Sequence, residues 1–237
     1  MLLRDVRLGG SQEWSFGGGA MPTVVSGMTV KEGSTLTVPA GTTVKSYNGV
    51  IYVRGTLVSA GSNQNPAVFT AFNDDTKGGD SNGSWEGDYP GNYIWAGISV
   101  ADSGRAELPN TEIRYAWTGL NVWNGGEAEI HGAIFDSQTG VNATTYVDAT
   151  NVDWGSPSGP SPIGSGTKVV GNAVDVVPWV GSQAPVRPTP SAWTPTPNPT
   201  CQDFFVIGAR GSGEAPQGGA TYSSSADGFG ARTSQVA

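Results

Sequence analysis

The chain of 237 residues is poor in the side chains that enzymes most often use for chemistry. It contains one cysteine, Cys201, and one histidine, His131. A single cysteine excludes a disulfide bond within the chain. A single histidine, far in sequence from any Ser–Asp arrangement, excludes an ordinary Ser-His-Asp triad built from these residues alone.

Charge is also scarce, and positive charge most of all. Charged residues make up 14% of the chain, and 12 Lys and Arg stand against 20 Asp and Glu, for a net charge of −8. Nucleic acids and anionic membrane surfaces attract clustered Lys and Arg, so the composition argues against both as partners. No apolar run reaches the roughly 18 residues that a bilayer-spanning helix needs.

Glycine and proline, by contrast, are abundant. The chain has 36 Gly and 16 Pro, and short apolar runs rich in Val, Ile and Leu lie between them. These runs have three to five residues and lack helical spacing. Together they predict an all-β protein with many tight turns.

Two near-copies of one segment lie between residues 106 and 143. Ala106-Glu107-Leu108 recurs as Ala128-Glu129-Ile130, a shift of 22 (128 − 106), and Ile113 recurs as Ile134, a shift of 21 (134 − 113). The same period of 21 separates Val30 from Ile51 and Leu36 from Leu57. A fixed period of this length indicates stacked units that bury their apolar sides against one another.

We therefore predict a parallel β-helix of about five coils. The general crossover preference favours the right-handed form. Alternate residues of each run should point inward. The predicted core of the first half is Val30, Leu36, Val38, Val44, Ile51, Val53, Leu57 and Phe69.

Composition divides the chain into four parts. Residues 1–23 are Gly-rich and form either an ordered cap or a frayed tail, and residues 24–181 form the β-helix. Within it, residues 71–95 are an insertion, and residues 151–181 are a C-terminal cap of irregular backbone with large apolar anchors. Residues 182–200 are rich in Pro and Thr and predict an extended linker. Residues 201–237 contain one apolar strand and too little sequence for an independent domain.

The β-helical part resembles bacterial secreted, surface-associated right-handed parallel β-helix proteins. The resemblance rests on GTLVSAG, NPAVFTAFNDDTKGGDSNG, WAGISV and a closing segment with Asn151, Trp154, Gly155 and Ser158-Gly159-Pro160. Asp153 departs from the pattern, because a second aromatic residue is usual there. The resemblance implies an extracellular protein, although no signal peptide is visible at the N-terminus.

The segment 201–237 resembles the beginning of a cutinase-type serine esterase of the α/β-hydrolase fold. The resemblance rests on Cys201, FFVIGARGSGE and the stretch from Tyr222 to Val236. It implies that Ser212 helps form an oxyanion hole and that Cys201 would pair with a later cysteine. The nucleophile elbow Gly-x-Ser-x-Gly is absent, as are the Asp and His that follow it. We therefore expect a truncated esterase segment, with ester hydrolysis in the intact parent and none in this chain.

Aromatic and acidic residues offer two weaker candidate sites. Aromatic faces beside carboxylates suit carbohydrate binding; the candidates are Trp85, Tyr89, Tyr93, Trp95, Trp117 and Trp123. Asp74, Asp75 and Asp80 are candidate Ca²⁺ ligands, although their spacing differs from an EF-hand and a solvated acidic loop is the alternative. His131 aligns with Pro109 of the first copy, which predicts a turn or outward position on the surface and not a core position.

These observations lead to one main hypothesis and two alternatives. The main hypothesis is an extracellular, monomeric β-helix scaffold or binding module, without a cofactor, joined to a fragment of a cutinase-like esterase. The first alternative is a stand-alone β-helix that binds a polysaccharide or another cell-surface polymer. The second is a β-helix enzyme that degrades polysaccharides, which Lys45, Arg54, Arg105 and Arg114 do not favour because they form no cluster in sequence.

Overall fold

The computed structural model describes residues 2–13, 23–84, 90 and 94–182. The chain divides into two compact units, Met1–Val186 and Arg187–Ala237, and all described residues belong to the first. The predicted linker beyond Ser182 and the esterase-like segment 201–237 lie outside the described residues.

Every regular element in the described part is a β-strand, which confirms the all-β prediction. In chain order the strands are β1 (Leu2–Leu8), β2 (Ser11–Glu13), β3 (Thr23–Val30), β4 (Thr35–Pro39), β5 (Thr43–Ser46), β6 (Val50–Val53), β7 (Thr56–Ala60), β8 (Ala67–Ala71), β9 (Gly97–Val100), β10 (Arg105–Arg114), β11 (Thr118–Val122), β12 (Glu127–Phe135), β13 (Thr139–Ala143), β14 (Val147–Asp148), β15 (Val152–Asp153), β16 (Pro160–Ser161), β17 (Gly166–Val170) and β18 (Val174–Asp175).

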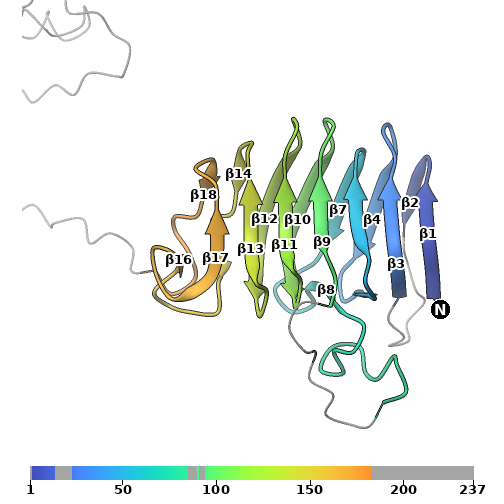
Figure 1. Cartoon of the computed structure of the whole chain (residues 1–237), viewed down its shortest axis with the longest axis horizontal. Helices are drawn as coiled ribbons and strands as arrows, with labels where there is room; N and C mark the ends of the chain where they lie inside the picture. Colours follow the sequence, from blue (N-terminus) through green and yellow to red (C-terminus); the bar gives the residue numbers. More distant parts are fainter. Residues whose placement is uncertain (1, 14–22, 85–89, 91–93, 183–237) are drawn as a thin grey trace, which may run out of the picture. The chain divides into compact units, whose positions relative to one another are not determined.

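The strands pair in three long ladders, and every strand pair among the described residues is parallel. The first ladder runs through β1, β3, β6, β9, β11, β13 and β17. The second runs through β2, β4, β7, β10, β12, β14 and β18, and the third through β3, β5, β8, β10, β12 and β15. Figure 1 shows these strands side by side from β1 to β18. The pairing is consistent with a parallel β-helix, and its first ladder holds more strands than the five coils that the repeat predicts.

The predicted core residues are buried, which confirms the inward positions read from the sequence. All eight are at most 1% exposed: Val30, Leu36, Val38, Val44, Ile51, Val53, Leu57 and Phe69. In β4 the burial alternates residue by residue, as it must when successive side chains point to opposite faces of a strand. Ile98, Leu120 and Val141 continue the same core and pair in register on β9, β11 and β13.

The change of the repeat from 22 to 21 has a structural cause in β10. Leu108 pairs with Ile130, a shift of 22, whereas Thr111 pairs with Gly132, a shift of 21. Pro109 and Asn110 therefore lie opposite a single residue, His131, which is the geometry of a β-bulge. Gly132 is required on the partner strand because its φ is +144° and a Cβ there would lie 2.2 Å from the Thr111 carbonyl oxygen.

One equivalence read from the sequence is wrong. Val30 pairs with Val53 and not with Ile51, whose partner is Met28. The reason is that β3 is continuous, whereas a corner separates β5 from β6 in the next coil. From Val25 to Met28 the chain advances three residues, and from their partners Ser46 to Ile51 it advances five, so the coil gains two residues.

Both ends of the stack are more regular than the sequence predicts. A cap or a tail is predicted for residues 2–13, but β1 and β2 pair with β3 and β4 and so add a coil. Irregular backbone is predicted for residues 151–181, but β15, β17 and β18 extend the three ladders. Trp154 is fully buried and Trp179 packs against the core, so the large apolar anchors are present.

Candidate functional site

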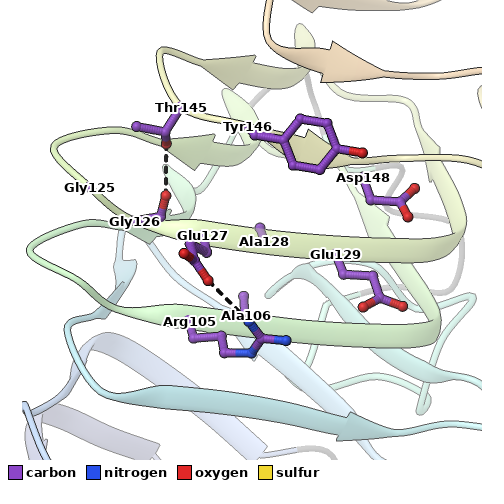
Figure 2. Close-up of a pocket in the computed structure, with 10 residues that line it drawn as sticks. All are labelled: Arg105, Ala106, Gly125, Gly126, Glu127, Ala128, Glu129, Thr145, Tyr146 and Asp148. Atoms are coloured by element: carbon purple, nitrogen blue, oxygen red, sulfur yellow. Dashed lines mark hydrogen bonds and ion pairs between the residues drawn. The ribbon is translucent and has the colours of Figure 1, made fainter. Parts of the chain in front are cut away.

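A shallow groove of about 470 Å³ lies on the second ladder, over β10, β12 and β14. Short turns on its border bring Thr145 close to Gly126, and the Thr145 hydroxyl donates a hydrogen bond of 2.7 Å to the Gly126 carbonyl. The groove is lined by Arg105, Ala106, Gly125, Gly126, Glu127, Ala128, Glu129, Thr145, Tyr146 and Asp148. We call this surface the acidic groove (Figure 2).

Carboxylates on successive coils give the groove its charge. Glu107 pairs in register with Glu129, and Glu129 pairs in register with Asp148. Asp175 continues the row on β18. Neighbouring strands lie about 4.8 Å apart, so the row places an acidic side chain on each of four consecutive coils.

Arg105 is the cation of this groove, and two carboxylates already hold it. Its Nε donates to Glu107 Oε1 at 2.6 Å and its Nη1 donates to Glu127 Oε2 at 3.0 Å. The hydrogen bond and charge of Glu107, with a contribution from Glu127, raise the pKa of Arg105 above its ordinary value. The carboxylates of Glu129 and Asp148 do not share this cation.

His131 borders the groove on β12 and lies outside the core as expected, but its side chain is only 29% exposed because it contacts two neighbours. Its Nδ1 lies 2.7 Å from the Thr150 carbonyl oxygen and its Nε2 lies 2.9 Å from Glu129 Oε1. Burial lowers the pKa of His131, but the Thr150 carbonyl, Glu129 and Asp148 outweigh it and raise the pKa above its usual range. Because both partners accept hydrogen bonds, the geometry suits an imidazolium with a proton on each nitrogen.

Tyr146 supplies an aromatic face beside these carboxylates. Its side chain is 63% exposed, the largest exposed fraction among the large hydrophobic residues described. Figure 2 shows the ring on the same surface as Glu129 and Asp148. A ring beside carboxylate acceptors can contact an apolar face of a ligand while the carboxylates accept hydrogen bonds from its hydroxyl groups.

Of the aromatic residues predicted for sugar binding, the three that the structure describes do not share one surface. Trp95 is 2% exposed and its Nε1 donates to the Arg114 carbonyl at 2.8 Å, so it belongs to the core. Trp117 and Trp123 are exposed but lie at opposite ends of β11. Trp123 donates from Nε1 to Ser99 Oγ at 3.1 Å. Trp85, Tyr89 and Tyr93 lie outside the described residues.

The acidic residues of the insertion are not all solvated, although the sequence favours a solvated loop. Asp74 is fully buried, and its carboxylate accepts hydrogen bonds from the hydroxyls of Thr70 and Thr76 at 2.6 and 2.5 Å. Asp80 accepts from the backbone of Asn82 and Gly83 in an exposed turn. Within residues 2–13, 23–84, 90 and 94–182 no three Asp, Glu, His or Cys residues are grouped to hold a metal ion.

Two lysines, Lys45 and Lys77, anchor the insertion to the third ladder. Lys45 is fully buried and its Nζ donates to the Gly79 carbonyl. Burial lowers the pKa of Lys45, against the opposing charges of Asp74, Asp75 and Asp80. Lys77 Nζ lies 2.6 Å from Glu112 Oε2 on β10, which ties the same turn to the stack. These contacts tie the insertion to β5 and β10.

The sequence does not identify the residues of the acidic groove as a site. Glu107 and Glu129 recur at the repeat spacing, which is also the pattern of ordinary surface residues. Their shared register is the one signal that could reveal the acidic row. The row does not follow the repeat spacing at Asp148, because the coil between Glu129 and Asp148 is shorter and the two residues are only 19 apart (148 − 129). Ser212 and Cys201, the candidates from the esterase resemblance, lie outside the described residues.

Comparison of the chain with protein-family models, curated proteins and solved structures gave no match. In the part of the chain that the structure describes, no helix is long and apolar enough to cross a membrane.

Proposed function

We propose that the strand stack is a binding module for a neutral, hydroxyl-rich polymer of the polysaccharide kind, which it holds in the acidic groove. The observation that carries the proposal is the 63% exposed Tyr146 side chain beside the carboxylates of Glu129 and Asp148. A sugar ring has an apolar face of C–H groups and a rim of hydroxyls. The aromatic ring would contact the face, and the carboxylates would accept hydrogen bonds from the hydroxyls.

The charge of the groove supports a neutral ligand over an anionic one. Arg105 is engaged by Glu107 and Glu127, and His131 is paired with Glu129, so Asp148 leaves the groove with a negative charge. Phosphate-rich polymers would be repelled there. We propose binding, because the exposed Tyr146 ring and the in-register carboxylates of Glu129 and Asp148 form a contact surface for such a polymer.

Affinity electrophoresis of the full chain in gels with soluble neutral glucans and mannans tests the proposal. We expect retardation of the wild type and at least about tenfold weaker binding by Tyr146→Ala, because an aromatic contact is worth about 0.5–1.5 kcal/mol beyond the area it buries. Tyr47→Ala is the matched control, since Tyr47 is 50% exposed and lies outside this groove. Absence of retardation in every neutral polymer, or equal retardation of Tyr146→Ala and wild type, would overturn the proposal.

We also propose that the stack is a right-handed β-helix of an extracellular, monomeric protein and that Cys201–Ala237 begins a cutinase-like esterase. The support is the sequence motif FFVIGARGSGE after the Pro-rich segment 182–200. On this proposal the binding module would hold the polymer near an esterase supplied by sequence after Ala237. The coding sequence downstream tests it: a Gly-x-Ser-x-Gly elbow, a second Cys, then Asp and His are expected, and a reading frame that ends at Ala237 would refute it.

A further inference from the structure

A second groove, of about 420 Å³, lies on the first ladder, away from the acidic groove. It is lined by Arg7, Thr29, Lys31, Glu32, Tyr52 and Arg54. Arg7 pairs in register with Thr29, and Thr29 pairs in register with Tyr52, so the groove crosses β1, β3 and β6. We call this surface the basic groove.

Three of the 12 Lys and Arg of the chain meet in this groove. Only Glu32 opposes them among the lining residues. Arg54 Nε lies 3.1 Å from Asp102, in a pair whose side chains are 60% and 40% exposed. Among the described residues, neither Arg7 nor Lys31 forms an ion pair. With Arg54 paired to Asp102, Arg7 and Lys31 face one lining carboxylate, Glu32, so the groove keeps a positive charge on a chain with a net charge of −8.

The three basic residues are not clustered in the sequence, but the tertiary structure brings them together. Arg7 and Lys31 differ by 24 in position (31 − 7), and Lys31 and Arg54 differ by 23 (54 − 31). The second separation is one turn of the stack, and the first is one turn of 22 plus two residues, so residues distant in sequence meet on adjacent coils. Arg54 follows Val53, which pairs with Val30 immediately before Lys31.

Tyr52 gives this groove a second kind of contact. Its side chain is 45% exposed, and it lies on the outer face of β6 between buried Ile51 and Val53. Arg7 and Tyr52 are two coils apart, so they are separated by roughly 10 Å across the ladder. An extended chain of linked rings that carries negative groups could contact the aromatic ring and reach the arginine at the same time.

We propose that the basic groove binds an anionic polysaccharide, one whose rings carry carboxylate or sulfate groups. The guanidinium of Arg7 presents a planar fork that matches such an oxyanion, and Lys31 adds a point charge at the groove border. The Tyr52 ring contacts the C–H face of a sugar in the same chain. The module thus holds two polymer types on two ladders, a neutral one on the acidic groove and an anionic one on the basic groove.

The test is affinity electrophoresis of the full chain with a soluble polyuronate and with a sulfated glycan, at low and physiological salt. We expect retardation that weakens with salt, and at least about tenfold weaker binding by the triple variant Arg7→Gln, Lys31→Gln, Arg54→Gln. Tyr52→Ala should also bind more weakly. Lys168→Gln is the matched control, because Lys168 is exposed on β17, outside the basic groove.

The outcomes separate this site from its alternatives. Equal loss in Lys168→Gln and in the triple variant would show nonspecific charge attraction and overturn the proposal. Full displacement of the polymer by low millimolar inorganic phosphate would show a simple anion site and also overturn it. Sedimentation that shows self-association in wild type and none in the triple variant would identify a second copy of the chain as the occupant, which likewise overturns it. Loss of neutral-polymer binding in Tyr146→Ala tests only the acidic groove, since that ring lines the other surface.

Discussion

His131 Nε2 lies 2.9 Å from Glu129 Oε1, two residues earlier on the same strand. The other ring nitrogen, Nδ1, lies 2.7 Å from the Thr150 carbonyl oxygen on the next coil. Both partners are acceptors, so the contact is complete only when both nitrogens carry a proton. The imidazolium therefore links two coils at the border of the acidic groove.

This link predicts a pH-dependent stability. The pKa of His131 is raised in the folded chain, where Glu129 and Asp148 are the facing carboxylates. The contribution of His131 to the free energy of unfolding is therefore fully present below the pKa of the unfolded chain, near 6.5. It is lost as the pH rises through the folded pKa. His131→Gln should lower the melting temperature at pH 5 by about 2–4 °C, because one hydrogen bond is worth about 1 kcal/mol, and should have less effect at pH 9. Melting curves that differ from wild type equally at both pH values would contradict the assignment.

Asp74 is predicted to be essential for the insertion. Asp74→Ala leaves the hydroxyls of Thr70 and Thr76 without their acceptor and removes a carboxylate 3.8 Å from Arg114 Nη1. We expect a loss of about 3–5 kcal/mol in the free energy of unfolding, because unpaired buried groups are costly. Urea denaturation measures it. Asp80→Ala, in an exposed turn, is the control and should cost no more than about 1 kcal/mol.

Gly132 is predicted to tolerate no side chain. A Cβ there would lie 2.2 Å from the Thr111 carbonyl oxygen and 2.6 Å from its nitrogen, at a φ of +144°. Gly132→Ala should therefore destabilise by more than about 3 kcal/mol or prevent folding. Gly33→Ala separates the strain of a positive φ from the clash with a neighbouring backbone. At Gly33 the φ is +70°, but nothing lies within 4 Å of the added Cβ. That variant should lose only about 1–2 kcal/mol, and equal losses at the two positions would show that contact with Thr111 is unimportant.

Trp95 is predicted to act on stability and not directly on binding. Trp95→Ala should cost about 3–5 kcal/mol, because the side chain is 2% exposed and fills the core between the strands. Trp123→Ala, with a side chain 42% exposed, is the comparison and should change stability by about 1 kcal/mol. A folded Trp95→Ala chain with wild-type melting and lost polysaccharide retention would contradict the core assignment.

Much of the fold could be predicted from the sequence because burial follows local rules. Side chains alternate in strands, and the repeat places apolar residues at the same position of each coil. For this reason Leu36 and Leu57, and Ile98, Leu120 and Val141, are buried partners as expected. The register of Val30 differs from the prediction because the coil that contains the corner Tyr47-Asn48-Gly49 is two residues longer there.

The sequence by itself therefore determined an all-β chain, a repeat period such as the 21 between Leu36 and Leu57 (57 − 36), and the inward positions, since these follow from local alternation and period. Only the tertiary structure decided which outward side chains meet. Coils of unequal length bring Glu129 beside Asp148 at an interval of 19 (148 − 129) and Lys31 near Arg54 at an interval of 23 (54 − 31). Outward residues obey no burial rule that would fix their register, so both grooves become visible only when the coils are stacked.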